Sequence, residues 1–226
     1  MRGILYFVAT PIGNLGDLSE RAKQIFSSVD LILCEDTRVT HKLLSAFEIK
    51  TSTESFHQHS TEKKIESILA ELEKGKNIAV VTDAGTPGIS DPGGKLVEAA
   101  LARFGNEVAI YPIPGPCAAI AALSISGFPT DHFHFLGFPP QKKGRIKFFQ
   151  ALANFSETSV FYESTHRIIK ALEQMEESIP HRHIVVCREL TKLHETTYRG
   201  TPSEVTEQLK STSMKGEFVI VVGPQK

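Results

Sequence analysis

The chain has 226 residues, of which 41% are hydrophobic and 23% charged, a composition typical of folded globular proteins that excludes a disordered chain. Its 25 lysines and arginines are balanced by 26 aspartates and glutamates. This balance excludes binding of nucleic acid through an overall positive charge, so that such binding would require a local basic patch. No apolar run approaches the roughly 20 residues that span a bilayer, so we expect no membrane partner.

The cysteines and the first residues indicate a cytoplasmic protein. Cys34, Cys117 and Cys187 are odd in number and form no CxxC pair, which predicts neither a disulfide framework nor a zinc knuckle. The segment 1–9 is short, carries one positive charge and runs into a loop rich in Pro and Gly. It is typical of a first strand and not of a secretory signal.

The first half of the chain alternates apolar strands with amphipathic helices, the pattern of α/β units. The clearest helix is 60–74, where Ile65, Ile68, Leu69 and Leu72 form one apolar stripe that ends at Gly75. The other elements expected in this half are strands over 4–9, 31–34, 78–82 and 108–111, and helices over 18–29, 37–47 (capped by Asp36 or Thr37) and 96–104.

A domain boundary is expected after residue 112. Pro112, Pro114, Gly115 and Pro116 lie within five residues, and such a stretch is unsuited to continue a helix or a strand. The sequence therefore predicts two α/β domains, residues 1–112 and 113–226. In the second we expect helices over 117–126, 167–175 and 202–210, and strands over 132–138, 160–162, 183–188, 195–199 and 217–222.

Three loops rich in Gly and Pro follow predicted strands, over residues 10–17, 83–94 and 114–118. Ligands of open α/β sheets bind beyond the carboxyl ends of the strands, and glycine lets the backbone approach a ligand closely. One such loop is explained by a tight turn alone, but three favour a ligand site. GxGxxG and GxxxxGK[ST] are absent, so neither a dinucleotide oxidoreductase nor a P-loop NTPase is supported.

Six motifs in order resemble the ribosomal RNA small subunit methyltransferase I family, a branch of the tetrapyrrole methylase superfamily. The resemblance covers residues 4–223. The motifs are Val8-Ala9-Thr10-Pro11-Ile12-Gly13-Asn14-Leu15, Cys34-Glu35-Asp36-Thr37-Arg38, Asp83-Ala84-Gly85-Thr86-Pro87 with Asp91-Pro92-Gly93, Pro114-Gly115-Pro116-Cys117-Ala118, Phe161-Tyr162-Glu163-Ser164-Thr165-His166-Arg167 and Arg188-Glu189-Leu190-Thr191-Lys192.

The resemblance implies two α/β domains with S-adenosylmethionine in the cleft between them (tetrapyrrole methylase fold). It also implies methylation of a cytidine 2′-hydroxyl in the decoding region of small-subunit (16S) rRNA, a homodimer and no metal. The substrate would be small-subunit rRNA or the small ribosomal subunit. By analogy with the superfamily, the residues that would contact the cofactor are Pro11, Asp83, Ala84, Gly85, Thr86, Ile89, Cys117, Ala118, Tyr162, Glu163 and Leu190.

A ribose hydroxyl is a poor nucleophile, so a base, or a charge that stabilises the developing alkoxide, would assist methyl transfer. The candidates on loops after strands are Glu163, Glu189 and Lys192, with His166 beside them. None of these residue types at these positions is decisive. Asp36 and Arg38 follow an apolar strand and predict either a contact with the RNA or a local ion pair that caps the next helix.

For the RNA itself, the densest basic run is Lys142, Lys143, Arg145 and Lys147. It predicts either phosphate contacts or a solvated helix face. His57, His166 and Arg167 are further candidates for RNA contacts. His57 and His59 form an HxH pair, which lacks the third and fourth ligands of a zinc site, so we expect no metal.

Two other functions stay open at this level. One is a tetrapyrrole methyltransferase of the same fold that acts on a corrin or porphyrin precursor. The other is a ribosome-binding module without catalytic activity. The second and fifth motifs favour the RNA branch, and the intact loops favour an enzyme over a binding module.

Overall fold

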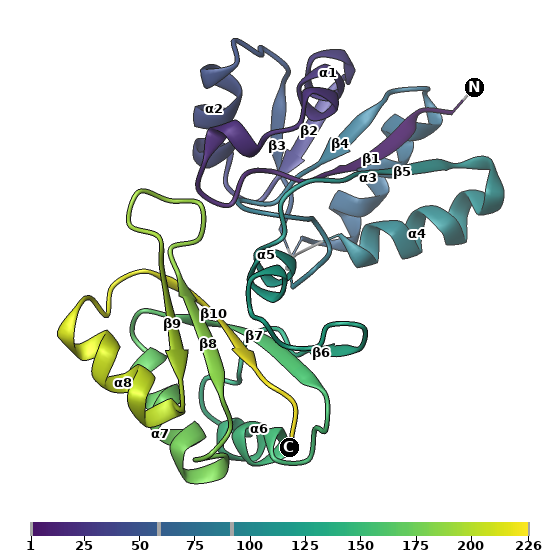
Figure 1. Ribbon diagram of the computed structural model, residues 1–226. Coiled ribbons are helices and arrows are strands. Elements are labelled where there is room, and N and C mark those ends of the chain that lie inside the picture. Colours follow the sequence, from purple (N-terminus) through teal and green to yellow (C-terminus); the bar gives the residue numbers. More distant parts are fainter. Residues whose placement is uncertain (1, 58–59, 91–92, 226) are drawn as a thin grey trace. The chain divides into compact units, whose positions relative to one another are not determined.

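The computed structural model describes residues 2–57, 60–90 and 93–225. The chain forms two compact units, Met1–Cys117 and Ala118–Lys226, here the N-terminal and C-terminal units (Figure 1). The division lies five residues after the expected boundary at 112, because the chain crosses Pro112 without leaving the sheet. In the described part of the chain, no helix is long and apolar enough to cross a membrane.

The N-terminal unit is built on a parallel sheet of five strands in the order β3-β2-β4-β1-β5. The strands are β1 (Ile4–Val8), β2 (Leu31–Cys34), β3 (Thr53–Ser55), β4 (Ile78–Val80) and β5 (Ala109–Ile113). Central strands of a parallel sheet are buried on both faces, and accordingly every residue of β4 is buried. Pro112 is tolerated in β5 because β5 is an edge strand.

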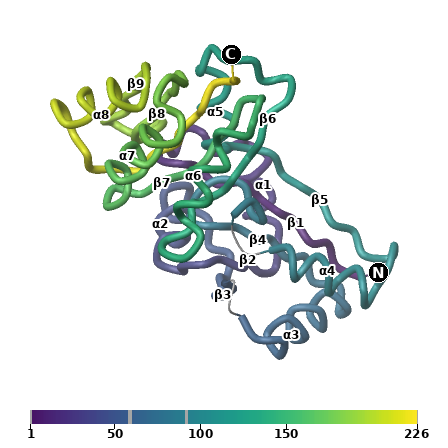
Figure 2. The backbone as a smooth tube through the Cα atoms, turned by 90° about the horizontal axis from the view of Figure 1, so that it is seen from below, coloured from purple at the N-terminus to yellow at the C-terminus, as the bar shows by residue number. Residues whose placement is uncertain are grey.

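Helices cover both faces of this sheet. They are α1 (Glu20–Ser28), α2 (Thr37–Ala46), α3 (Glu62–Glu73) and α4 (Gly94–Phe104). Phe26 of α1 and Leu44 of α2 pack in one apolar core, whereas Leu69 of α3 and Leu96 of α4 pack in a second core on the opposite face. Figure 2 shows α3 and α4 together on one side of the sheet.

This arrangement creates a topological switch point between β1 and β4. The connection from β1 runs through α1 to β2, on one face, and the connection from β4 runs through α4 to β5, on the other. The chain therefore leaves these two neighbouring strands in opposite directions. In open α/β sheets, ligands bind at such a point, outside the carboxyl ends of the strands.

The C-terminal unit has a mixed sheet in the order β6-β7-β10-β8-β9. β6 pairs with β7 in parallel, and the other pairs are antiparallel. The strands are β6 (Phe133–Phe135), β7 (Thr158–Ser164), β8 (Ile184–Arg188), β9 (Thr196–Gly200) and β10 (Glu217–Val222). The order places β10, the last strand of the chain, in the centre of the sheet.

Helices α6 (Arg145–Leu152), α7 (Ile168–Ser178) and α8 (Pro202–Ser211) pack on one face of this sheet. Their core includes Phe149, Phe161 and Leu172. Since neighbouring side chains of a strand point to opposite faces, Tyr162 of β7 points away from this core. The short helix α5 (Ala118–Ser124) contacts β7 and β10, and the Ala119 amide donates to the Tyr162 hydroxyl at 3.3 Å.

Candidate functional site

Two loops of the N-terminal unit are joined at the switch point. The Thr10 amide, just after β1, donates to the Gly85 carbonyl at 2.9 Å, and the Gly85 amide donates back to the Thr10 carbonyl at 3.1 Å. The Thr10 hydroxyl also donates to the Thr82 carbonyl at 3.1 Å. These bonds hold the loops after β1 and β4 in a defined geometry, so the ligand edge of the sheet is preformed.

The loop after β5 joins the same group. The Thr86 hydroxyl donates to the Pro116 carbonyl at 3.2 Å. Gly85 has φ +85°, and a Cβ atom there would lie 3.5 Å from Ile12 Cγ2 and 3.6 Å from the Pro116 carbonyl oxygen. A large side chain at position 85 would therefore occupy the space between all three loops.

Seven of the predicted cofactor residues lie in these three loops. Gly85 is buried, Pro11, Thr86 and Cys117 are half-buried, and Asp83, Ala84 and Ile89 are exposed. These seven residues are mostly apolar or small, and the exposed Asp83 is the only carboxylate among them. Asp91 and Pro92 of the same motif lie outside the described residues.

Asp36 and Arg38 form a local cap on α2. Asp36 accepts a hydrogen bond from the Arg38 amide at 2.8 Å and forms an ion pair with the Arg38 guanidinium at 2.6 Å. The hydrogen bond from the Arg38 side chain, followed by the one from its amide, lowers the pKa of Asp36 to about 2. The Asp36 amide donates to Asp83 at 3.2 Å, which links the loops after β2 and β4. The structure therefore supports the helix-capping reading of this pair.

Glu163, a candidate base, is a buried ion-pair centre of the C-terminal unit. Its side chain is fully buried, accepts a hydrogen bond from Arg145 at 2.8 Å and forms an ion pair with Arg167 Nε, 2.9 Å away. The Ser164 amide donates to it at 2.8 Å. Each carboxylate oxygen thus has at least one described partner, and these contacts give Glu163 a structural role as the counter-ion of two arginines.

The prediction that all four basic residues of the run 142–147 face RNA is wrong for Arg145, which is buried. Its side chain is only 6% exposed, and besides Glu163 it donates to Gln174 at 3.0 Å and to the Pro140 carbonyl at 3.4 Å. Burial of a guanidinium requires such partners. Arg167 is likewise directed at Glu163 and at the Ser164 hydroxyl, 3.1 Å away.

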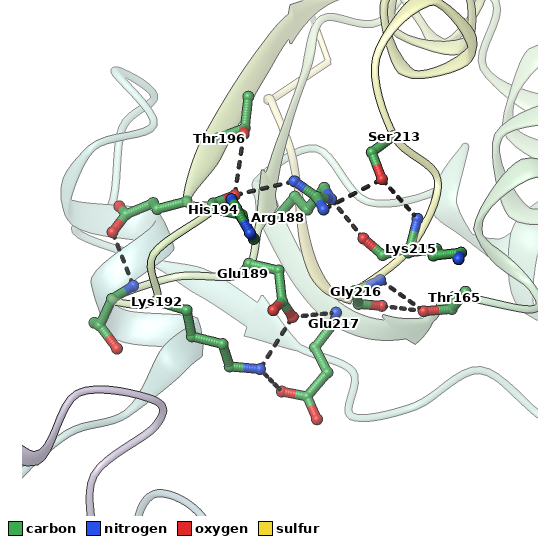
Figure 3. Close-up of polar contacts among 12 residues, drawn as sticks. Thr165, Arg188, Glu189, Lys192, His194, Thr196, Ser213, Lys215, Gly216 and Glu217 are labelled. Atoms are coloured by element: carbon green, nitrogen blue, oxygen red, sulfur yellow. Dashed lines mark hydrogen bonds and ion pairs between the residues drawn. The ribbon is translucent and has the colours of Figure 1, made fainter.

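The loop from Glu189 to Glu195, between β8 and β9, is held by a dense set of polar contacts (Figure 3). Lys192 Nζ lies 3.0 Å from Glu189 and 2.8 Å from Glu217, and the Glu217 amide donates to Glu189 at 2.8 Å. Arg188 donates to the carbonyls of Lys215 and His194 at 2.5 and 3.0 Å. Lys192 is thus held between two carboxylates, and both Lys192 and Glu189 are partly exposed.

The charges in this loop shift one another's pKa. Burial acts to raise the pKa of Glu189, but the Glu217 amide and the Lys192 ammonium outweigh it, and the pKa falls below its ordinary value. Burial acts to lower the pKa of Lys192, but the hydrogen bonds to Glu217 and Glu189 raise it overall. Both groups therefore stay charged at neutral pH. Leu190 between them is buried.

Comparison with known proteins identifies the family. Residues 4–206 match the family model of Tetrapyrrole (Corrin/Porphyrin) Methylases. The chain is 44% identical over 222 residues to the ribosomal RNA small subunit methyltransferase I of Halalkalibacterium halodurans, covering 98% of this chain and 76% of that protein. The chain belongs to the ribosomal RNA small subunit methyltransferase I family. The protein of the same name from Synechocystis sp. is 47% identical over 97% of this chain and 78% of its own length.

A solved structure extends the comparison beyond this family. The uroporphyrin-III C-methyltransferase from Thermus thermophilus, solved in complex with S-adenosylhomocysteine, has a TM-score of 0.64 and 16% identity, covering 98% of this chain and 97% of its own. At this identity the likeness concerns the fold alone. It agrees with the two α/β units and with the tetrapyrrole methylase fold expected from the sequence.

The other residues predicted from the family resemblance lie in the C-terminal unit, with one exception. Tyr162 is half-buried, with its hydroxyl at the start of α5, where Ala118 is the first residue. His166 is exposed. His57, in the N-terminal unit, is exposed, its amide donates to the Ser60 hydroxyl at 2.9 Å, and His59 lies outside the described residues.

The contacts that join the three loops were not predictable from the sequence. Thr10 and Thr82 tie the loops together, and Ile12 faces Gly85. Thr10 and Ile12 lie within the first Gly- and Pro-rich segment and Thr82 directly precedes the second, but only the strand order reveals that β1 lies between β4 and β5.

Proposed function

We propose that this chain is an S-adenosylmethionine-dependent methyltransferase that methylates the 2′-hydroxyl of a cytidine in the decoding region of small-subunit rRNA. The observation that carries the proposal is the preformed switch point, where reciprocal bonds between Thr10 and Gly85 and the bond from Thr86 to Pro116 join three loops. Membership in the family supplies the reaction and the RNA.

The residues of the N-terminal unit fit the cofactor. Gly85 leaves a space bordered by Ile12 and Pro116, and a side chain there would fill it. We propose that Pro11, Ala84, Gly85, Thr86, Ile89 and Cys117 form this wall and that the exposed Asp83 is a polar contact. The cofactor, when bound, supplies an electrophilic methyl group on a sulfonium for in-line displacement.

The protein's contribution to the chemistry is chiefly positioning, which is worth up to about 7 to 11 kcal/mol in favourable reactions. Glu163 is enclosed by Arg145 and Arg167, so we do not assign it proton abstraction. Lys192 keeps 28% of its side chain exposed and carries a positive charge. We propose that Lys192 stabilises the negative charge that develops on the ribose oxygen as the hydroxyl proton passes to solvent water, with Glu189 and Glu217 holding its ammonium in place.

For the RNA, we propose that Lys142, Lys143 and Lys147 contact phosphates. All three are exposed and have no ion pair among the described residues, so their charge is available to a polyanion. We also propose a homodimer in the cytoplasm. The three cysteines of the chain are free, and two of them are buried, as expected in a reducing compartment.

The proposal is tested with the purified chain. Calorimetry should detect binding of S-adenosylmethionine, and a labelled methyl group should then pass to isolated small ribosomal subunits or their rRNA, but not to large subunits. A uroporphyrinogen-type acceptor serves as the control for the tetrapyrrole alternative. Transfer to the tetrapyrrole and not to RNA would reassign the substrate. Binding of small subunits without cofactor binding would instead indicate the non-catalytic module.

A further inference from the structure

An exposed aromatic cluster lies at one edge of the C-terminal sheet. Phe138 lies three residues after the end of β6 and is 54% exposed. Its ring centroid lies 5.2 Å from that of Tyr162, and Phe135 lies 5.4 Å from Tyr162 on the same cluster. Aromatic rings grouped in this way on a surface mark a binding site more often than a single exposed apolar residue does.

The segment after the cluster carries three exposed lysines and no acidic residue. Lys142, Lys143 and Lys147 follow Phe138 within nine residues, and no aspartate or glutamate occurs between Asp131 and Glu157. An aromatic surface beside unpaired lysines is complementary to a ligand that carries both flat rings and phosphates. It is poorly matched to an apolar protein face, which would leave the ammonium groups desolvated.

The backbone between the aromatic ring and the lysines is held in place. The Tyr162 amide donates to the Gly137 carbonyl at 2.8 Å, on one side of Phe138. On the other side, the buried Arg145 guanidinium bonds Glu163 at 2.8 Å and the Pro140 carbonyl at 3.4 Å. A loop already fixed in one conformation loses little entropy when a ligand binds, so this surface is preorganised.

We propose that Phe138 stacks on an unpaired base of the RNA while Lys142 and Lys143 bind the flanking phosphates. The inference rests on the proposed function, since it takes rRNA as the substrate, and it adds the recognition of a single-stranded segment. Single-stranded RNA is bound by stacking of its bases on aromatic side chains next to a basic surface, whereas the bases of a duplex are already stacked and closed to such a ring.

The test compares variants of the full chain in binding a short unstructured RNA oligonucleotide and an RNA duplex, by fluorescence anisotropy at several salt concentrations. The variants are Phe138→Ala, Phe138→Tyr, which keeps a ring, and Ile146→Ala as the matched control. Ile146 is an apolar residue of the same segment and is 66% exposed. Far-UV circular dichroism and sedimentation of each variant check its fold and its oligomeric state.

We expect Phe138→Ala to weaken single-strand binding about 5- to 150-fold, the range for loss of one stacked base. The dependence of affinity on salt should stay the same, because no charge is removed. Phe138→Tyr and Ile146→Ala should bind within about twofold of the parent. Unchanged binding by Phe138→Ala would overturn the inference, as would an altered oligomeric state with RNA affinity retained, which would make the cluster a contact between copies.

Methyl transfer by the parent protein, measured in parallel, separates this inference from the proposed function. A parent that transfers no methyl group to small subunits refutes the proposed function, whatever Phe138 does. A parent that methylates small subunits, together with a Phe138→Ala variant that binds and methylates equally well, refutes the stacking role alone.

Discussion

Replacement of Glu163 by glutamine separates a structural role from a catalytic one. Glu163 is the carboxylate that neutralises the buried Arg145 and also pairs with Arg167. Glutamine keeps the shape of the side chain but removes its charge. Arg145 would then be a buried cation whose remaining described acceptors are the neutral oxygens of Gln174 and Pro140.

The expected destabilisation follows from the burial of the pair. Removal of one partner of a buried ion pair costs about 3 to 5 kcal/mol, and the exposed fractions here are 6% for Arg145 and 0% for Glu163. The amide oxygen of glutamine still accepts one hydrogen bond, so we expect about 3 kcal/mol, at the lower end of that range. Against a typical stability of about 5 to 15 kcal/mol, this is a large loss.

Hydrogen exchange read by mass spectrometry is the suitable assay, because the two units need not unfold together. Peptides from β7 and α6 should lose protection in Glu163→Gln, while peptides from β1 and β4 of the N-terminal unit serve as an internal reference. Glu173→Gln, an exposed site on α7, is the matched control and should change stability by no more than about 0.5 kcal/mol.

A second variant checks the coupling between the two charges. Arg145→Met should destabilise the same peptides. The double variant should cost less than the sum of the single changes, because it lacks the buried Arg145 cation that Glu163→Gln alone leaves without a carboxylate. Unchanged protection in Glu163→Gln, combined with complete loss of methyl transfer, would refute our structural account and restore Glu163 as a catalytic base.

Three further predictions concern ligands. Gly85→Trp should abolish binding of S-adenosylmethionine in calorimetry while circular dichroism shows an intact fold. The control is Gly127→Trp, because Gly127 also has a positive φ but has open space around it, and this variant should bind normally. Equal binding by both variants would place the cofactor elsewhere. The triple change of Lys142, Lys143 and Lys147 to alanine should reduce the slope of log affinity against log salt by about 2 units on single-stranded RNA, with S-adenosylmethionine affinity unchanged; an unaltered slope would make these lysines a solvated face. Methyl transfer should survive EDTA once magnesium-dependent folding of the RNA is controlled, and a loss restored only by zinc added to the protein would contradict the expectation of a metal-free enzyme.

Elements with a strong apolar pattern were predictable from the sequence. The strand expected over 217–222 is β10, and Asp36 caps α2 as one of the two expected residues. Termini shifted where local hydrogen bonds decide them: α3 begins after Thr61, whose hydroxyl caps it. The strand β3 was missed because it is a short edge strand of polar residues, which carries no alternating apolar signal.

The site could be predicted in part. The Gly- and Pro-rich loops were identified, but their convergence depends on the strand order, which no local pattern encodes. The basic run illustrates the remaining limit. Lys142 and Arg145 look alike in the sequence, yet Arg145 begins α6 and is buried against Glu163. Only tertiary packing decides which cation of such a run faces solvent.

The position of the transferred methyl group tests the central claim most directly. Small-subunit rRNA labelled by the purified chain and methyl-labelled S-adenosylmethionine should be hydrolysed in alkali, which cleaves RNA through the free 2′-hydroxyl. We predict that the label appears in an alkali-resistant dinucleotide with a methylated cytidine at its 5′ side. Label released in a mononucleotide would place the methyl group on a base and contradict 2′-O-methylation.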